Sequence, residues 1–117
     1  MKIAVSYNNG VVADCFSKTK EFKIYTAKKG QVLSQEMLDS SEVKSCDLPE
    51  FLGNNDVDVL LCGGIGAKAK SALAKECIVF FPGVVGKADH QIKCFLDGSL
   101  SFNPMLSCTS MGEEKED

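Results

Sequence analysis

The chain has 117 residues, of which 44% are hydrophobic and 25% charged, and its net charge is −3. This length is typical of one domain that buries roughly two-thirds of its unfolded-chain surface. Its basic residues are scattered lysines without arginine, so a clustered nucleic-acid-binding face is not expected. No stretch approaches the about 18 apolar residues of a membrane span, and the start lacks a signal-peptide pattern. We expect a cytoplasmic protein with one domain over residues 1–100 and a partly disordered tail over 101–117.

The first half of the chain predicts three strands. Residues 3–7 are mostly apolar and end at the turn signal Asn8-Asn9-Gly10. Residues 21–27 alternate between apolar and polar side chains, which is typical of a half-buried strand. Residues 31–37 then return as the third strand of a hairpin. The stretch between the first two strands, residues 11–20, is interpreted as a loop.

The second half predicts helices that alternate with strands. A short helix has capping signals near Asp47 and ends near Gly53. The remaining elements are a buried strand over 57–62, a helix over about 66–76, an apolar strand over 78–81 and a helix over about 87–97 that ends at Gly98.

This order, β-β-β-α-β-α-β-α, predicts a ribonuclease H-like α/β fold with three layers. The right-handed crossover rule makes the last two strands parallel to the first. The expected sheet is mixed and five-stranded, has the order 3-2-1-4-5 with strand 2 antiparallel, and is flanked by helices. Open α/β sheets bind ligands at the carboxyl ends of their strands. That edge should collect the Cys15 loop, the start of the Cys46 loop, and the turns at 63–66 and 82–86.

The glycine-rich turn that follows the buried strand is the first candidate site. Its glycines are expected to turn with φ > 0 and to bring a ligand close to main-chain N–H groups at a helix N-terminus. A plain strand–helix junction is the competing interpretation, and no Gly-Lys-Ser/Thr follows to make a P-loop. The candidate cofactor-binding residues are Gly63, Gly64, Ile65, Gly66 and Gly83.

The six cysteines, at positions 15, 46, 62, 77, 94 and 108, form no Cys-x-x-Cys pair. In a reducing compartment they are not expected to be a disulfide framework. Cys15 lies in a polar loop at the ligand edge, Cys46 precedes a helix start that would lower its thiolate pKa, and Cys108 follows the last element. Each of these three could be a metal ligand or a bystander thiol. Cys62, Cys77 and Cys94 are interpreted as structural, and His90 as a solvated helix residue.

Several segments resemble the dinitrogenase iron–molybdenum cofactor biosynthesis family, which includes NifX-like and NifB-C-terminal-like small domains. The segments are 7–17, 57–66, 82–89 and 95–100, and the resemblance spans roughly residues 1–108. It implies a ribonuclease H-like fold. It also implies a small non-enzymatic carrier or scaffold for iron–sulfur or molybdenum-containing metal–sulfur clusters.

The chain departs from the family pattern at positions where ligands would lie. The family's opening motif usually reads His-Phe-Gly, and this chain has Cys15-Phe16-Ser17. Ser45-Cys46 replaces a His-Gly loop, and a Cys- and His-rich tail is reduced to Cys108. Thiolate is a softer ligand than imidazole and suits iron–sulfur or copper–sulfur chemistry. We therefore expect an iron–sulfur or Mo/Cu-containing cluster on Cys15, Cys46 and Cys108, cluster donor or acceptor proteins as partners, and a possible homodimer.

Two other functions are alternatives to a cluster carrier. A nuclease on this fold needs several acidic side chains around two divalent metals, but Ala4, Ser6 and Cys62 stand at the relevant strand positions. That function is not favoured. A protein-interaction or regulatory module with no bound metal stays open.

Overall fold

The computed structural model describes residues 1–105, and the predictions for 106–117, Cys108 among them, lie outside this range. Its strands are β1 (Lys2–Asn8), β2 (Val11–Val12), β3 (Glu21–Lys28), β4 (Gln31–Asp39), β5 (Val59–Leu61) and β6 (Val79–Phe81). Its α-helices are α1 (Leu48–Asn54), α2 (Ala67–Lys75) and α3 (Ala88–Asp97), and two 3-10 turns are η1 (Phe16–Lys18) and η2 (Ser45–Asp47).

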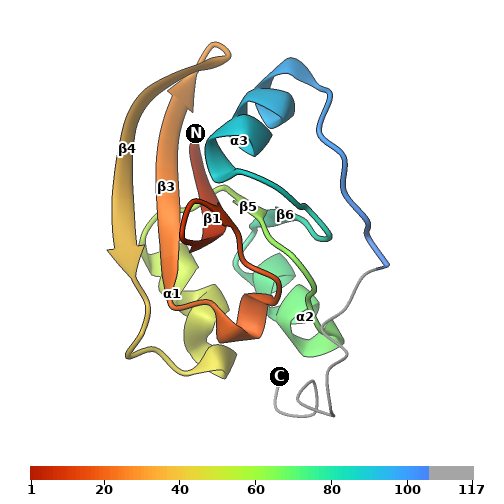
Figure 1. Ribbon diagram of the computed structural model, residues 1–117. Helices are drawn as coiled ribbons and strands as arrows, with labels where there is room; N and C mark the ends of the chain where they lie inside the picture. The colour runs from red at the N-terminus through yellow and green to blue at the C-terminus, as the bar shows by residue number, and fades with distance from the viewer. Residues whose placement is uncertain (106–117) are drawn as a thin grey trace.

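The main sheet has the order β4-β3-β1-β5-β6 (Figure 1). β1 pairs antiparallel with β3 and parallel with β5, and β5 pairs parallel with β6. This confirms the predicted order and the antiparallel second strand, and the fold is ribonuclease H-like. β2 was expected to be part of a loop, but it pairs antiparallel with the end of β1.

Two hydrophobic clusters cover the two faces of the sheet. Alternate residues of β1 point to opposite faces: Ala4 packs in the cluster under α1 and α2, and Ile3 and Val5 pack in the cluster under α3. The predicted apolar strand over 78–81 is found as β6, an edge strand in which Val79 is 57% exposed. The domain therefore has three layers, with α3 on one side of the sheet and α1 and α2 on the other.

A small polar network joins α3 to the sheet. Oδ1 of Asp89, in the first turn of α3, accepts hydrogen bonds from the Tyr25 hydroxyl at 2.6 Å and from Lys23 Nζ at 2.9 Å. The hydrogen bonds from Tyr25 and then from Lys23 lower the pKa of Asp89. Burial, followed by the Asp89 hydrogen bond, raises the pKa of the Tyr25 hydroxyl. The ionised carboxylate therefore fixes the start of α3 against β3.

The first residues of the predicted tail contact the body of the domain. The Phe102 ring packs edge-on against Phe81, with ring centroids 5.0 Å apart. The Asn103 N–H donates to the Pro82 carbonyl at 2.8 Å, and Lys70 Nζ donates to the Pro104 carbonyl at 3.1 Å. Across residues 1–105, no helix has the length and apolar character needed to cross a membrane.

Candidate functional site

The Cys15 loop and the glycine turn lie side by side at the carboxyl ends of β1 and β5. Cys15 forms a parallel bridge with Gly64. The Phe16 N–H donates to the Gly64 carbonyl at 2.9 Å, and the Gly64 N–H donates to the Asp14 carbonyl at 2.7 Å. The two segments are about 50 residues apart in sequence and are held together by main-chain hydrogen bonds.

Glycine is needed at position 63 for close packing. A Cβ there would lie 2.3 Å from the Asp14 carbonyl oxygen and 2.5 Å from that of Ala13. The expectation that these glycines turn with φ > 0 is wrong, because Gly63, Gly64 and Gly66 all have negative or extended φ values. The missing side chain makes room for the Cys15 loop.

Gly83 brings a third segment to this edge. Its φ is +72°, and its N–H donates to the Gly63 carbonyl at 3.0 Å. The amides of Gly64 and Gly83 are therefore already occupied. By contrast, none of the hydrogen bonds within residues 1–105 uses the N–H of Gly63, Ile65 or Gly66. All three residues are buried, and the last two amides stand at the start of α2.

The N-terminus of α2 has no capping or acidic side chain that would offset the positive end of its helix dipole. Gly66 is the N-cap residue and offers no side-chain hydrogen bond, and the first turn has no acidic residue. The first turns of α1 and α3 contain Glu50 and Asp89, respectively. Lys68, in the first turn, adds a positive charge to the positive end of the α2 dipole. This end of the helix therefore favours an anion.

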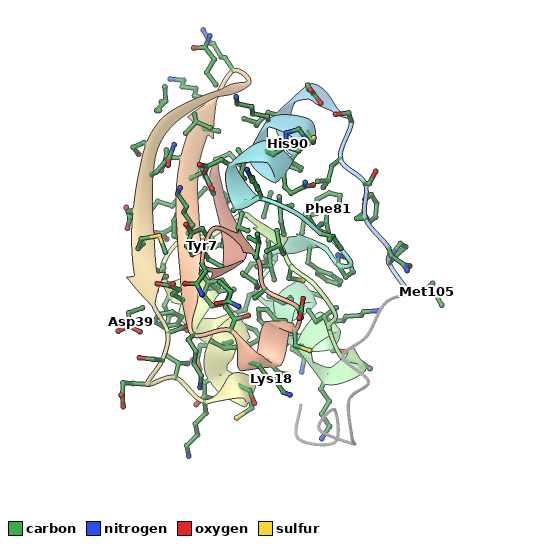
Figure 2. All side chains as sticks on the ribbon, in the orientation of Figure 1. Tyr7, Lys18, Asp39, Phe81, His90 and Met105 are labelled. Atoms are coloured by element: carbon green, nitrogen blue, oxygen red, sulfur yellow. The ribbon has the colours of Figure 1, made fainter. Side chains whose placement is uncertain are left out.

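A cavity of about 180 Å³ lies between η1, η2 and the first half of α2. Its walls are largely apolar, and Lys68 and Cys46 contribute polar groups. The lining residues are Phe16, Ser17, Ser45, Cys46, Pro49, Lys68, Ala69 and Ala72. Figure 2 labels Lys18, the last residue of η1, at this end of the molecule.

The predicted sulfur ligands fall in different environments. Cys46 is an exposed free thiol, with Sγ 3.8 Å from Asp47 Oδ1. Cys15 is half-buried and its sulfur is disulfide-bonded, so a metal-binding role for it requires reduction. Residues 1–105 hold no group of three His, Cys, Asp or Glu side chains that could bind a metal ion. The three-cysteine site that includes Cys108 therefore stays a prediction.

The remaining cysteines differ in exposure. Cys62 is fully buried, and burial raises the pKa of its thiol to about 12, so it stays protonated in the core. Cys77 is exposed in the turn after α2, with φ +61°, so it does not fill the core. Cys94 Sγ lies 3.6 Å from Nε2 of His90 on α3. We did not predict this contact, although the i, i+4 spacing of the two residues could have signalled it.

The fold and this edge define a class of protein: a small ribonuclease H-like domain with thiols and helix N–H groups at the carboxyl ends of its parallel strands. The sequence profile described as "Dinitrogenase iron-molybdenum cofactor" matches residues 1–98. The chain belongs to this family.

Solved structures show the same fold at low sequence identity. The crystal structure of PH0822 is 22% identical, covers 100% of both chains and has a TM-score of 0.83. The apo form of the orange protein from Desulfovibrio gigas is 23% identical, with 92% of this chain and 96% of that chain covered and a TM-score of 0.78. No curated protein matches the chain.

Proposed function

We propose that this domain is a non-enzymatic binder or carrier of an anionic metal–sulfur cluster and serves in metallocluster assembly or storage. The cluster would be of the iron–sulfur or the Mo/Cu-containing kind. One observation carries the proposal: the Cys15 loop is hydrogen-bonded to the glycine turn at the uncapped N-terminus of α2. Membership of the iron–molybdenum cofactor family supports it.

The charge of such a cluster suits the start of α2. Metal–sulfur clusters with thiolate and sulfide ligands are commonly anionic, and N–H groups that hydrogen-bond to their sulfurs tune the reduction potential. The N–H groups of Ile65 and Gly66 would fill this role, and Lys68 would add a positive charge. Anion binding would also satisfy helix N–H groups that have no capping side chain.

Cysteine sulfur would supply the covalent attachment. Cys46 borders the cavity and is exposed enough to meet an incoming cluster. Cys15, once reduced, would contribute a second thiolate beside the glycine turn, and Cys108 remains the predicted third ligand. Phe16, Pro49, Ala69 and Ala72 would shield the cluster from water, which affects its potential.

We infer carriage because thiolates and main-chain amides hold a cluster without performing acid–base chemistry on a substrate. The cytoplasm is the compartment we propose, because its reducing conditions would open the Cys15 disulfide and keep the thiols free for a cluster. Cluster donor and acceptor proteins would be the partners, and transfer would begin at Cys46, the exposed thiol that borders the cavity. A homodimer that shares one cluster would supply additional thiolates.

The test is anaerobic reconstitution of the reduced full-length chain with Fe²⁺ and sulfide, and separately with Cu⁺ and tetrathiomolybdate. We expect bound metal and visible charge-transfer absorption in at least one mixture. Cys15→Ser and Cys46→Ser should each reduce the absorption. Cys77→Ser is the matched control because Cys77 is also an exposed thiol but lies at the other end of α2.

A colourless, metal-free product from both mixtures would contradict cluster binding and favour the regulatory module without metal. If cluster binding were equally strong in all three variants, the proposed ligands would be wrong.

A further inference from the structure

His90 and Cys94 form a pair of metal-binding side chains on α3, away from the glycine turn. They are one helical turn apart, so their side chains lie on the same face of the helix. His90 is exposed and Cys94 is half-buried, and the Sγ and Nε2 atoms are 3.6 Å apart. Figure 2 shows His90 at the opposite end of the molecule from Lys18 of η1.

The separation between the two atoms agrees with joint coordination of one cation. Zinc lies about 2.0–2.1 Å from a histidine nitrogen and about 2.3 Å from a cysteine sulfur, and prefers tetrahedral geometry. These bond lengths at a tetrahedral angle place nitrogen and sulfur about 3.6 Å apart. A square-planar arrangement would need about 3.1 Å and a linear one about 4.4 Å. The observed 3.6 Å matches the tetrahedral case.

We propose that His90 Nε2 and Cys94 Sγ form a two-donor chelate for a tetrahedral, thiol-binding cation, with Zn²⁺ as the best match. On binding, the Cys94 thiol would release its proton to solvent and form the metal–sulfur bond, while neutral His90 would donate a nitrogen lone pair. The hydrated cation would lose the waters that the two protein donors replace and those shed as its coordination becomes tetrahedral, and the two remaining positions would hold water or an external ligand.

The end of α3 favours a cation. Cys94 is in the last turn, where the carbonyl groups give the helix its negative end. Asp97 adds a carboxylate nearby: hydrogen bonds from Ser99, and to a smaller extent the charge of His90, lower its pKa. Gly98, with φ +85°, caps the helix, and the Ser99 N–H donates to the Cys94 carbonyl at 2.8 Å. The cap fixes the backbone that carries the pair, so little ordering is needed for binding.

This site differs in kind from the proposed cluster site. It uses one nitrogen and one sulfur, and no third donor joins them within the part of the chain that the structure describes. An open two-donor site releases its metal more readily than a closed structural zinc site with four protein ligands. Cation binding here does not depend on the cluster proposal.

The test is a titration of Zn²⁺ into the reduced full-length chain in competition with a chromophoric chelator. Co²⁺ serves as a spectroscopic substitute whose absorption reports sulfur and nitrogen ligation. We expect one zinc at this site. Cys94→Ser and His90→Gln should each weaken binding by at least about tenfold, because even loss of a group that only supports a metal ligand costs that much.

Cys77→Ser is the control, since it removes an exposed thiol for which residues 1–105 provide no histidine contact. It should leave zinc affinity unchanged. A chain with both Cys15→Ser and Cys46→Ser should keep the α3 zinc even if it loses the cluster. Equal affinity in the wild type and Cys94→Ser would overturn the proposal. Loss of all zinc in the Cys15/Cys46 variant would also overturn it, by assigning the metal to the other end.

Discussion

The Cys15 loop, the glycine turn and the Gly83 turn form one edge, here called the glycine edge, that is joined by main-chain hydrogen bonds. The start of α3 is held both by main-chain bonds, such as the one from the Ala88 N–H to the Gly10 carbonyl, and by side-chain bonds. At α3, one carboxylate, that of Asp89, accepts two side-chain hydrogen bonds from β3. Backbone contacts therefore dominate the first region, and side-chain contacts contribute strongly to the second.

This difference has a functional consequence. Main-chain hydrogen bonds do not depend on the side chain at position 15, so the edge can carry cysteine there without losing its shape, whereas position 63 requires glycine. The attachment of α3 depends in part on the Asp89 and Tyr25 side chains, and replacing either should lower stability. Substitution of the exposed Cys46 should therefore change binding, and substitution of Asp89 should change stability.

The largest effect should come from Gly63→Ala. Its Cβ would meet two main-chain carbonyls that cannot rotate away, so we expect a loss of about 3 kcal/mol or more in the free energy of unfolding. Urea denaturation measures it. Gly30→Ala is the control: this glycine has φ +78° and open space around it, and the change should cost about 1 kcal/mol. Equal losses in the two variants would refute the close-packing role of Gly63.

Asp89→Ala should have the next largest effect, about 2 kcal/mol, because it leaves the buried Tyr25 hydroxyl without its acceptor. Tyr25→Phe removes the hydroxyl itself and should cost less. In the double variant, Tyr25→Phe should recover part of the stability that Asp89→Ala loses, because no hydroxyl is then left without an acceptor. If the double variant were as unstable as the sum of the two single changes, the hydrogen bond would not explain the effect.

The same carboxylate should make stability depend on pH. The pKa of Asp89 is lowered on folding from its ordinary value of 3.8, so its contribution is fully present above that value and is lost as the pH falls through the lower folded-state pKa. Urea midpoints of wild type and Asp89→Asn should therefore converge in acid. If the difference between the two urea midpoints did not change with pH, the ionised Asp89 carboxylate would not be the source of the stability.

Cys62→Ala should have a moderate effect on stability and none on cluster loading. The side chain is fully buried, and its loss leaves a small cavity that should cost about 1–2 kcal/mol. Because the buried thiol stays protonated, it is not expected to bind the cluster. Loss of charge-transfer absorption in a folded Cys62→Ala protein would show that the buried cysteine belongs to the site.

Cys46→Ser should give the smallest change in stability, within about 0.5 kcal/mol, since the side chain is exposed. Its cluster absorption should nevertheless fall. Thermal denaturation of the metal-free protein and the absorption of the reconstituted protein check the two halves of this prediction. A large loss of stability with unchanged absorption would reverse the roles assigned to Cys46 and Cys62.

The fold was predictable because periodicity and chirality act locally. Alternation defined the strands, and the crossover rule ordered them. The cap at Gly98, with φ +85°, followed from a glycine at the end of a helical pattern. The pairing of β2 was missed because a two-residue strand has no periodicity and depends on a neighbour already in place.

The site was harder to predict because its contacts join distant parts of the chain. The need for glycine at position 63 arises from the Asp14 carbonyl, and no local pattern reveals such an approach. The sequence did place Cys15 and the glycine turn at one edge, but it could not tell which amides would be occupied. The His90–Cys94 contact had a local signal in the i, i+4 spacing of the two residues. Each was interpreted singly, His90 as a solvated helix residue and Cys94 as a structural thiol, so the pair was missed.

Cluster binding at the start of α2 is tested most directly by an amide ¹H–¹⁵N NMR spectrum of the reduced chain. It would be recorded before and after loading with the diamagnetic Cu⁺–tetrathiomolybdate mixture. We expect the largest shifts at the amides of Ile65 and Gly66 and around Cys46, with small shifts along α3. Tight loading that leaves the Ile65 and Gly66 amides unchanged, or the largest shifts at α3, would contradict it.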